Sequence, residues 1–394
     1  MTMTFDELKT MDDTYVMQTY ARFPVDIDHG VNATLYSLSG KEYIDFTSGI
    51  GVNSLGCAHP RWVQAIADQA GKLGHISNLY YTQPGAQLAK TLCQRAGMTC
   101  AFFGNSGAEA NEAMIKTTRK YSFDKYGKGR STILTLNRSF HGRTIATLTA
   151  TGQPAFHNYF FPLNEAFRYA EPPWESVLEQ AGDDVCGVMV ELIQGEGGVN
   201  PLDREFVQKL ARLCQEKDWL LLIDEVQTGI GRTGSLFAYQ QFGVQPDVVS
   251  FAKGIAGGMP MGGILTGDKC AKVLSFGTHG STFGANPISA AAALTVLDIL
   301  DDGMMAQVKE KGEYLRAGIR SIGSPELGDI VGMGLMLGVD VKGPRTNKEL
   351  AALLAENGLL ILTAGSRLRL LPPLTITKDE MDKGLAILKQ TLAQ

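Results

Sequence analysis

The chain has 394 residues, of which 44% are hydrophobic and 20% are charged, and its formal net charge at pH 7 is −5. This composition is that of an ordinary folded globular protein, and the length suggests roughly two to three domains. The mild negative charge argues against a basic surface for nucleic acid or an anionic membrane. No apolar run reaches the roughly 20 residues that a membrane-spanning helix needs.

The N-terminal stretch and the cysteines indicate a reducing compartment. The first residues, MTMTFDELKTMDD, lack the basic and then apolar pattern of a signal peptide and the arginine-rich pattern of a transit peptide. The six cysteines never form a C-x-x-C pair, and the six histidines include no H-E-x-x-H. Neither a disulfide framework nor a metal site is therefore predicted. We expect a cytoplasmic protein.

Apolar runs of strand length alternate with amphipathic stretches through the middle of the chain. This rhythm predicts an α/β domain with a mostly parallel sheet. The candidate strands are residues 100–103, 132–136, 186–191, 220–226, 248–252 and 263–266, and the candidate helices between them include 108–121, 204–217 and 287–300.

The two ends of the chain are expected to form a second, smaller unit. The alanine-rich helix from residue 287 is long and should leave the large domain, and the tail that follows mixes short strands and helices. We predict an N-terminal segment at 1–45 that packs on the small domain, a large domain at 46–289, and a small α+β domain at 290–394 that begins with a long linking helix.

A glycine motif follows the strand at 220–226. Gly229 to Gly234 spells G-x-G-x-x-G, the fingerprint of a dinucleotide-binding turn. That fold needs a tight turn directly after the strand and an acid at the end of the next strand. Here three residues separate Glu225 from Gly229, and the next acid, Asp247, precedes its strand. The motif is better interpreted as a connecting loop.

Asp224 and Lys253 stand at the carboxyl ends of two successive strands, 253 − 224 = 29 residues apart. A buried carboxylate needs a cation, so a salt bridge is the simplest interpretation. The alternative is a pyridoxal phosphate site. Such a site needs a lysine for the Schiff base, a carboxylate for the pyridine nitrogen, a phosphate cradle and a flat group over the ring.

Two further segments could complete such a site. The residues around Ser106 follow a strand and open a helix, where backbone N–H groups bind phosphate, although an ordinary helix cap has the same sequence. Phe140 follows the strand at 132–136 and could stack on a ring, although a single aromatic residue is more often part of a core.

Together these segments resemble the class III aminotransferases, pyridoxal-phosphate enzymes of fold type I, over nearly the whole chain. The resemblance implies a large domain with a mostly parallel seven-stranded sheet and a smaller α+β domain. The motifs that carry it are NSGAEANE (105–112), FHGRT (140–144), ELIQGEGG (191–198), LLIDEVQTGIGRTG (221–234), SFAKGIAGGMPMGG (250–263), GSTFGANP (280–287) and RLLPPL (369–374).

The resemblance assigns roles at the cofactor. Lys253 would bind the cofactor covalently and later move the substrate proton, and Asp224 would pair with the pyridine nitrogen. Thr282 would reach the cofactor phosphate of a partner subunit, which implies a homodimer with active sites at its interface. The cofactor-binding residues would be Ser106, Gly107, Ala108, Phe140, Asp224, Val226, Gln227, Lys253 and Thr282.

The resemblance also implies two carboxylate-binding arginines, in agreement with the geometry of a guanidinium group. Arg369 would bind the α-carboxylate of glutamate, and Arg143 would bind the far carboxylate of either substrate. Glu196 would neutralise Arg369 while the amino donor is bound. The substrate-binding residues would be Tyr20, Arg143, Glu196, Ser281 and Arg369. Arg232 and Arg367 are expected to be solvated surface charges.

Several segments are similar to those of acetylornithine aminotransferases in particular, among them TYARFPV from Thr19 and SNLYYT from Ser77. The similarity implies transfer of the terminal amino group of N-acetylornithine to 2-oxoglutarate, as in arginine biosynthesis. Ile50 stands where ornithine aminotransferases have a tyrosine, which argues against free ornithine. The alternatives are 4-aminobutyrate, succinylornithine, ornithine or another diamine as donor. A racemase, an aminomutase and a non-catalytic binding protein are less favoured.

Overall fold

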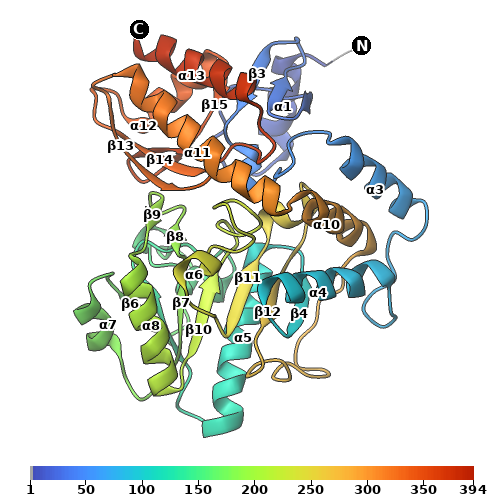
Figure 1. Cartoon of the computed structure of the whole chain (residues 1–394), viewed down its shortest axis with the longest axis vertical. Helices are drawn as coiled ribbons and strands as arrows, with labels where there is room; N and C mark the ends of the chain where they lie inside the picture. The colour runs from blue at the N-terminus through green and yellow to red at the C-terminus, as the bar shows by residue number, and fades with distance from the viewer. Residues whose placement is uncertain (1–2) are drawn as a thin grey trace.

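The computed structural model describes residues 3–394, so residues 1 and 2 of the expected N-terminal segment lie outside the described residues. A large domain carries most of the middle of the chain (Figure 1). The C-terminal elements and the N-terminal strands form a second mass beside it (Figure 1). No helix within residues 3–394 is long and apolar enough to cross a membrane.

The large domain is built on a seven-stranded sheet in which only β12 runs antiparallel to its neighbours. Every residue of β5, β7, β10, β11 and β12 is buried, as expected for a sheet covered on both faces. The mostly parallel seven-stranded sheet is thus confirmed. Its strands, in spatial order, are β4 (Cys100–Gly104), β12 (Gly262–Thr266), β11 (Val248–Phe251), β10 (Leu220–Asp224), β7 (Val185–Val190), β5 (Thr132–Leu136) and β6 (Phe167–Ala170).

Capping residues fix the ends of the helices that pack on this sheet. Asp203 accepts a hydrogen bond from the Phe206 amide and starts α8 (Arg204–Lys217), whose bounds match the prediction. Helix α5 (Gly107–Tyr126) begins at the Ser106 cap and runs five residues beyond the predicted end at 121. The other helical elements of this region are α2 (Ser48–Gly51), α3 (Pro60–Ala70), α4 (Gln83–Ala96), α6 (Ile145–Ala150), α7 (Trp174–Gln180), α9 (Tyr239–Phe242) and the 3₁₀ turns η1 (Pro154–Phe156) and η2 (Lys253–Ala256).

The helix predicted at 287–300 is observed at 287–299, but a second helix follows it in place of one long linking helix. Helix α10 (Pro287–Ile299) starts at the Asn286 cap and packs against α3 and α4 of the large domain. The chain then turns at Leu300 and continues as α11 (Asp302–Ile322), which packs against α13 and β13. We therefore propose that the large domain extends to about residue 300 and that α11 begins the small domain.

The small domain contains a four-stranded antiparallel sheet of β13 (Leu327–Met333), β14 (Met336–Val341), β17 (Arg367–Leu370) and β16 (Leu362–Ala364). It also contains α12 (Asn347–Glu356) and α13 (Lys378–Leu392). A second sheet joins it to the N-terminal strands, because β15 (Leu359–Leu360) pairs in parallel with β3 (Glu42–Asp45). The remaining strands of that sheet are β1 (His29–Val31) and β2 (Thr34–Tyr36).

A buried carboxylate fastens the N-terminal strands to the last helix. Glu380, at the start of α13, accepts hydrogen bonds from Asn32 Nδ2 at 2.6 Å, the Ala33 amide at 2.9 Å and the Thr34 hydroxyl at 3.2 Å. The same carboxylate accepts from the Thr377 amide at 2.9 Å and so caps its own helix. One side chain therefore stabilises the helix start and the contact between two distant segments.

We predict that Glu380→Gln lowers the free energy of unfolding by about 2–3 kcal/mol. The NH₂ group of the glutamine would face groups that themselves donate hydrogen bonds, and in this buried position they would lose their acceptor. The matched control is Glu349→Gln. Glu349 forms the same capping box with Thr346, but it is exposed and binds no other segment. Urea unfolding of both variants checks the difference, and equal losses would contradict the fastening role of Glu380.

Candidate active site

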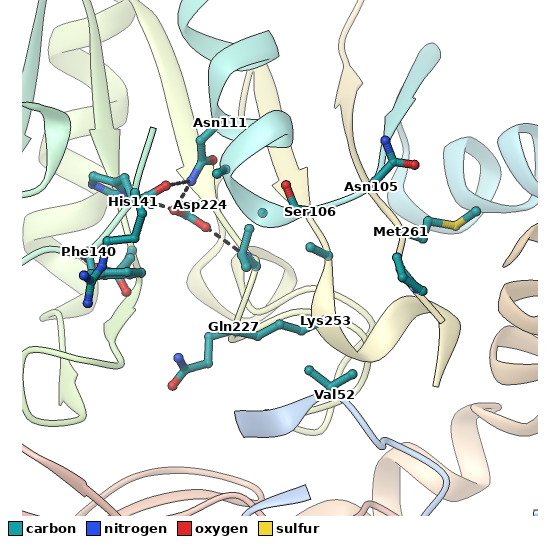
Figure 2. Close-up of a pocket in the computed structure, with 18 of the residues that line it drawn as sticks. Val52, Asn105, Ser106, Asn111, Phe140, His141, Asp224, Gln227, Lys253 and Met261 are labelled. Carbon is teal, nitrogen blue, oxygen red and sulfur yellow. Dashed lines mark hydrogen bonds and ion pairs between the residues drawn. The ribbon is translucent and has the colours of Figure 1, made fainter. Parts of the chain in front are cut away.

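A cavity of about 480 Å³ opens at the carboxyl ends of the central strands. Its walls come from the start of α5, the loop after β5, the segment after β10 and the lysine after β11 (Figure 2). Nine residues singled out in the sequence line this one cavity: Ser106, Gly107, Ala108, Phe140, Arg143, Asp224, Val226, Gln227 and Lys253.

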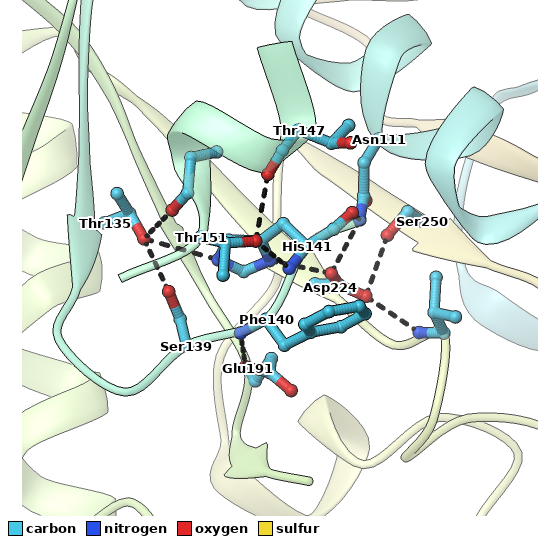
Figure 3. A network of polar contacts seen from close by, with 12 residues as sticks. Asn111, Thr135, Ser139, Phe140, His141, Thr147, Thr151, Glu191, Asp224 and Ser250 are labelled. Atoms are coloured by element: carbon cyan, nitrogen blue, oxygen red, sulfur yellow. Dashed lines mark hydrogen bonds and ion pairs between the residues drawn. The ribbon is translucent and has the colours of Figure 1, made fainter. Parts of the chain in front are cut away.

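Asp224 is buried at the end of β10, and each of its two carboxylate oxygens accepts two hydrogen bonds (Figure 3). Oδ2 accepts from Asn111 Nδ2 at 2.7 Å and from His141 Nδ1 at 2.8 Å. Oδ1 accepts from the Val226 amide at 3.0 Å and the Ser250 hydroxyl at 3.3 Å. These donors compensate the loss of hydration and fix the plane of the carboxylate.

The His141 ring is held from its other side by Thr135 (Figure 3). The Thr135 hydroxyl donates its proton to the Ala150 carbonyl at 2.9 Å, so its oxygen faces His141 Nε2, 3.3 Å away, as an acceptor. Both ring nitrogens therefore face oxygen atoms, which fixes the orientation of the ring.

Lys253 extends into the cavity from the first residue of η2 (Figure 2). Its backbone is in the left-handed region, with φ of 47°, a strained conformation of the kind that collects at functional sites. Burial lowers the pKa of Lys253, and the negative charge of Glu196 opposes that shift. A lowered pKa makes the neutral amine more available near neutral pH, as a general base requires.

Arg369 on β17 meets Glu196 in a two-pronged ion pair beside the cavity. Nη1 lies 2.6 Å from Glu196 Oε1, and Nη2 lies 3.2 Å from Oε2. Gln227 bridges the pair, since its Oε1 accepts from Arg369 at 3.2 Å and its Nε2 donates to Glu196 at 3.4 Å. Burial alone would raise the pKa of Glu196, but the Arg369 charge lowers it below its ordinary value.

Glu191 joins two loops of the cavity wall. Its Oε2 accepts from the Phe140 amide at 2.9 Å, and its Oε1 accepts from the Gly195 amide at 3.2 Å. Burial raises the pKa of Glu191 to about 7, against the opposing charge of His141. The carboxyl group thus holds the Phe140 loop against the loop that carries Glu196.

Comparison with known proteins identifies the family. The family model described as aminotransferase class-III matches residues 15–392. The chain belongs to the class III aminotransferases. It is 49% identical to an acetylornithine aminotransferase of Haemophilus ducreyi, over the whole of both chains. It is 45% identical to another of Aquifex aeolicus, over 96% of this chain and all of that one.

Solved structures agree with this assignment. The ornithine aminotransferase of Toxoplasma gondii superimposes with a TM-score of 0.94 at 30% identity, over 99% of this chain and 95% of that one. The N-acetylornithine aminotransferase of Stenotrophomonas maltophilia superimposes with a TM-score of 0.84 at 35% identity, over 98% of both chains. The enzyme is therefore an aminotransferase of fold type I, and its cofactor is pyridoxal 5′-phosphate.

The start of α5 fits the cofactor phosphate. Ser106 caps the helix, and no hydrogen bond among residues 3–394 uses the amides of Gly107 and Ala108. Such unpaired amides at a helix start bind anions. A Cβ at Gly107 would lie 2.7 Å from Val226 Cγ1, so only glycine lets this turn approach the segment after β10. These amides line the same cavity as Asp224.

Five expected site residues are not among those that line this cavity. Two of them, Glu196 and Arg369, lie beside it and bond to Gln227 of its wall. The other three are Tyr20, Ser281 and Thr282. Tyr20 is exposed at the surface. Ser281 accepts from the Gly284 amide at 3.0 Å and from Nδ2 of Asn105, a residue of the cavity wall, at 3.3 Å. Thr282 is exposed. Their roles in substrate or cofactor binding remain predictions.

The expectation of solvated surface charges at Arg232 and Arg367 is wrong. Arg232 is buried, and its guanidinium donates to the carbonyls of Leu335 and Pro372. Burial lowers the pKa of Arg232 to about 9, against the charge of Asp45, so the group stays cationic at neutral pH. Arg367 is partly buried and pairs with Asp340 at 2.6 Å.

The sequence did not single out Asn111, His141 or Glu191 as site residues. All three lie inside the motifs 105–112, 140–144 and 191–198. Asn111 is four residues after Gly107, one helical turn along α5, and therefore lies on the face of the helix that also carries the cradle. That spacing was a usable signal, whereas the partners of His141 and Glu191 come from distant segments.

We predict that Asn111→Ala weakens pyridoxal phosphate binding by about tenfold to a hundredfold, because Asp224 loses a hydrogen bond to a charged group. Titration of the apoenzyme with the cofactor, followed by absorbance, measures the change. Thr117→Val is the matched control, since Thr117 is buried on the same helix but bonds only to Ala113 of that helix. Unchanged affinity in Asn111→Ala would refute this role.

Proposed function

We propose that the enzyme transfers the terminal amino group of N-acetylornithine to 2-oxoglutarate, giving N-acetylglutamate 5-semialdehyde and glutamate, a step of arginine biosynthesis. The observation that carries the proposal is the identity of 40–49% to proteins named acetylornithine aminotransferase over nearly the whole chain. We assign the parts of this reaction to residues in and beside the cavity.

The bound cofactor supplies an electron sink for the carbon next to the transferred nitrogen. Asp224, held in place by four donors, would pair with the pyridine nitrogen and favour its protonated form. The Lys253 Nζ would take the proton from the substrate carbon and deliver it to the other carbon bonded to the transferred nitrogen, a step that its proximity makes fast. Phe140 and Val226, which both line the cavity, would enclose the ring.

The Arg369–Glu196 pair separates the two halves of the reaction. While an amino donor without an α-carboxylate near Arg369 is bound, Glu196 neutralises the guanidinium, as in the present geometry. The α-carboxylate of glutamate or 2-oxoglutarate displaces Glu196 and binds the Arg369 guanidinium in its place through two hydrogen bonds. Gln227, bonded to both partners, then loses one of them and is free to turn toward the cofactor ring.

Arg143 is the proposed partner for the carboxylate at the far end of both substrates. Its guanidinium lies at the cavity wall, 4.3 Å from the centre of the Phe156 ring and 5.6 Å from that of Phe140. Ile50 offers no polar atom to the free α-amino group of ornithine. This favours an acylated donor, with Tyr20 proposed to line its path.

We also propose a homodimer, located in the cytoplasm, in which Thr282 and Ser281 of one subunit complete the site of the other. Large apolar side chains gather where residues 76–81 meet residues 281–284, two segments joined by hydrogen bonds from Asn78 to Ser281 and Gly284. The exposed members are Ile76, Leu79, Tyr80, Tyr81 and Phe283. Helix α1 (Phe5–Tyr15) buries none of its residues, as expected if a second copy covers it.

The donor preference is tested by incubating the purified holoenzyme with 2-oxoglutarate and, separately, N-acetylornithine, ornithine or 4-aminobutyrate, and measuring glutamate. We expect N-acetylornithine to have the highest kcat/KM, by at least about tenfold. This is the size of discrimination expected when the site lacks a polar contact for the free α-amino group of ornithine. Lys253→Ala serves as the blank and should form no glutamate. Faster turnover of 4-aminobutyrate would reject the proposed donor.

The dimer is tested by light scattering. The wild type should have twice the 42.5 kDa mass of one chain. Tyr81→Asp should give monomers without aminotransferase activity, because a charge is costly in an apolar interface. Tyr81 is fully exposed in one chain, so the substitution should not disturb the fold of the monomer. Leu178→Asp, an exposed change on α7, should remain dimeric and active. A monomeric, active wild type would refute the proposal.

A further inference from the structure

The loop at 229–234, whose glycines suggested a nucleotide site, reaches from the cavity to the small domain. Asp224 and Gln227 lie at one end of this segment, and Arg232 lies eight residues after Asp224. The Arg232 carbonyl accepts a hydrogen bond from the Leu335 amide at 3.0 Å, and the Arg232 guanidinium donates one to the Leu335 carbonyl at 3.1 Å. The loop is thus tied to the small domain by main chain and side chain together.

The two carbonyls that Arg232 binds belong to the ends of two paired strands. Leu335 immediately precedes β14, and Pro372 follows β17 by two residues. Arg369 lies in β17 opposite Gly338 of β14. From Arg369 to Pro372 is three residues, roughly 10 Å of extended chain. The guanidinium therefore clamps the strand pair close to the substrate-binding arginine.

A third segment enters the same contact. Arg232 Nη2 donates to the Ser48 hydroxyl at 3.4 Å, and that hydroxyl donates to the Leu371 carbonyl at 2.6 Å. The Leu371 amide in turn donates to the Phe46 carbonyl at 2.8 Å. The chain just after β17 is held from both sides, and Arg232 lies at the centre of that junction.

We propose that Arg232 is a positioning residue for the dicarboxylate half of the reaction. It sets the place of Arg369 relative to the loop that carries Asp224 and Gln227, although it does not touch substrate or cofactor. The inference rests on the proposed function through the assignment of 2-oxoglutarate to Arg369. The loop at 229–234 would then help to position Arg369, in addition to connecting two layers of the fold.

The consequence is specific to one half-reaction. The donor half uses Arg143 and keeps Arg369 paired with Glu196, so a small displacement of β17 should affect it little. The dicarboxylate half needs the guanidinium fork of Arg369 at a fixed distance from Lys253, and displacements of about 1 Å are costly there. A purely structural arginine would instead weaken both halves equally.

The test compares Arg232→Lys with the wild-type holoenzyme. Lysine keeps the charge near Asp45 but has no fork to bridge two carbonyls. Isothermal titration with glutarate, an unreactive dicarboxylate, should show a Kd at least about tenfold higher, and the KM for 2-oxoglutarate should rise in parallel. The KM for N-acetylornithine should change less than about twofold. Unchanged glutarate affinity, or equal losses in both halves, would overturn the proposal.

Arg316→Lys is the matched control. Arg316 also donates to two backbone carbonyls, those of Ile330 and Gly332, but both lie within the small domain. Its glutarate affinity should equal that of the wild type. If Arg232→Lys does not fold, Ser48→Ala decides: it removes the hydroxyl between Arg232 and Leu371 and should raise the glutarate Kd by about threefold, and no rise would overturn the proposal.

The same measurements separate this inference from the proposed function. A wild type that binds glutarate and converts glutamate but rejects N-acetylornithine would refute the donor assignment and leave the role of Arg232 standing. A wild type with the expected donor and an Arg232→Lys variant with unchanged glutarate binding would refute only the role of Arg232.

Discussion

The buried carboxylate of Asp224 is the constraint on which the rest of the large domain depends. An ionised group removed from water costs several kcal/mol unless donors replace the lost hydration. Here the donors come from helix α5, the loop after β5, the backbone after β10 and strand β11. These four segments must all come within hydrogen-bonding distance of the two carboxylate oxygens of Asp224. Because the same segments carry or adjoin the phosphate cradle, Phe140 and Lys253, these groups surround a single cavity.

The second charged centre, Arg369 with Glu196, belongs to two different domains. Glu196 follows β8 (Ile193–Gln194) in the large domain, and Arg369 is part of the small-domain sheet. Gln227 is bonded to both and lies three residues after Asp224. The distance between Asp224 and the Arg369–Glu196 pair therefore depends on how the two domains are joined. Contacts that fix this junction, such as the Arg367 bonds to Gly198 and Asn200, act on the site without lining it.

The sequence predicted elements whose signals are local. The strand at 220–224 is a continuous apolar run, as in buried parallel sheets, and α8 has a capping aspartate and an amphipathic repeat. Strand β6 was missed because it is short, lies at the sheet edge and contains Arg168, so it lacks an apolar run. Arg232 was misjudged because the carbonyls that bury it are 103 and 140 residues away in the chain.

The glycine motif shows why a residue pattern needs its surroundings. Gly231 and Gly234 both have φ above 80°, in the region that favours glycine. A Cβ at Gly234 would lie 2.4 Å from Lys309 Cγ, and one at Gly231 would lie 3.1 Å from Leu374 Cδ1. In a dinucleotide site the same spacing admits a pyrophosphate. Here it admits helix α11 and the chain after β17, so the glycines serve the close approach of two domains.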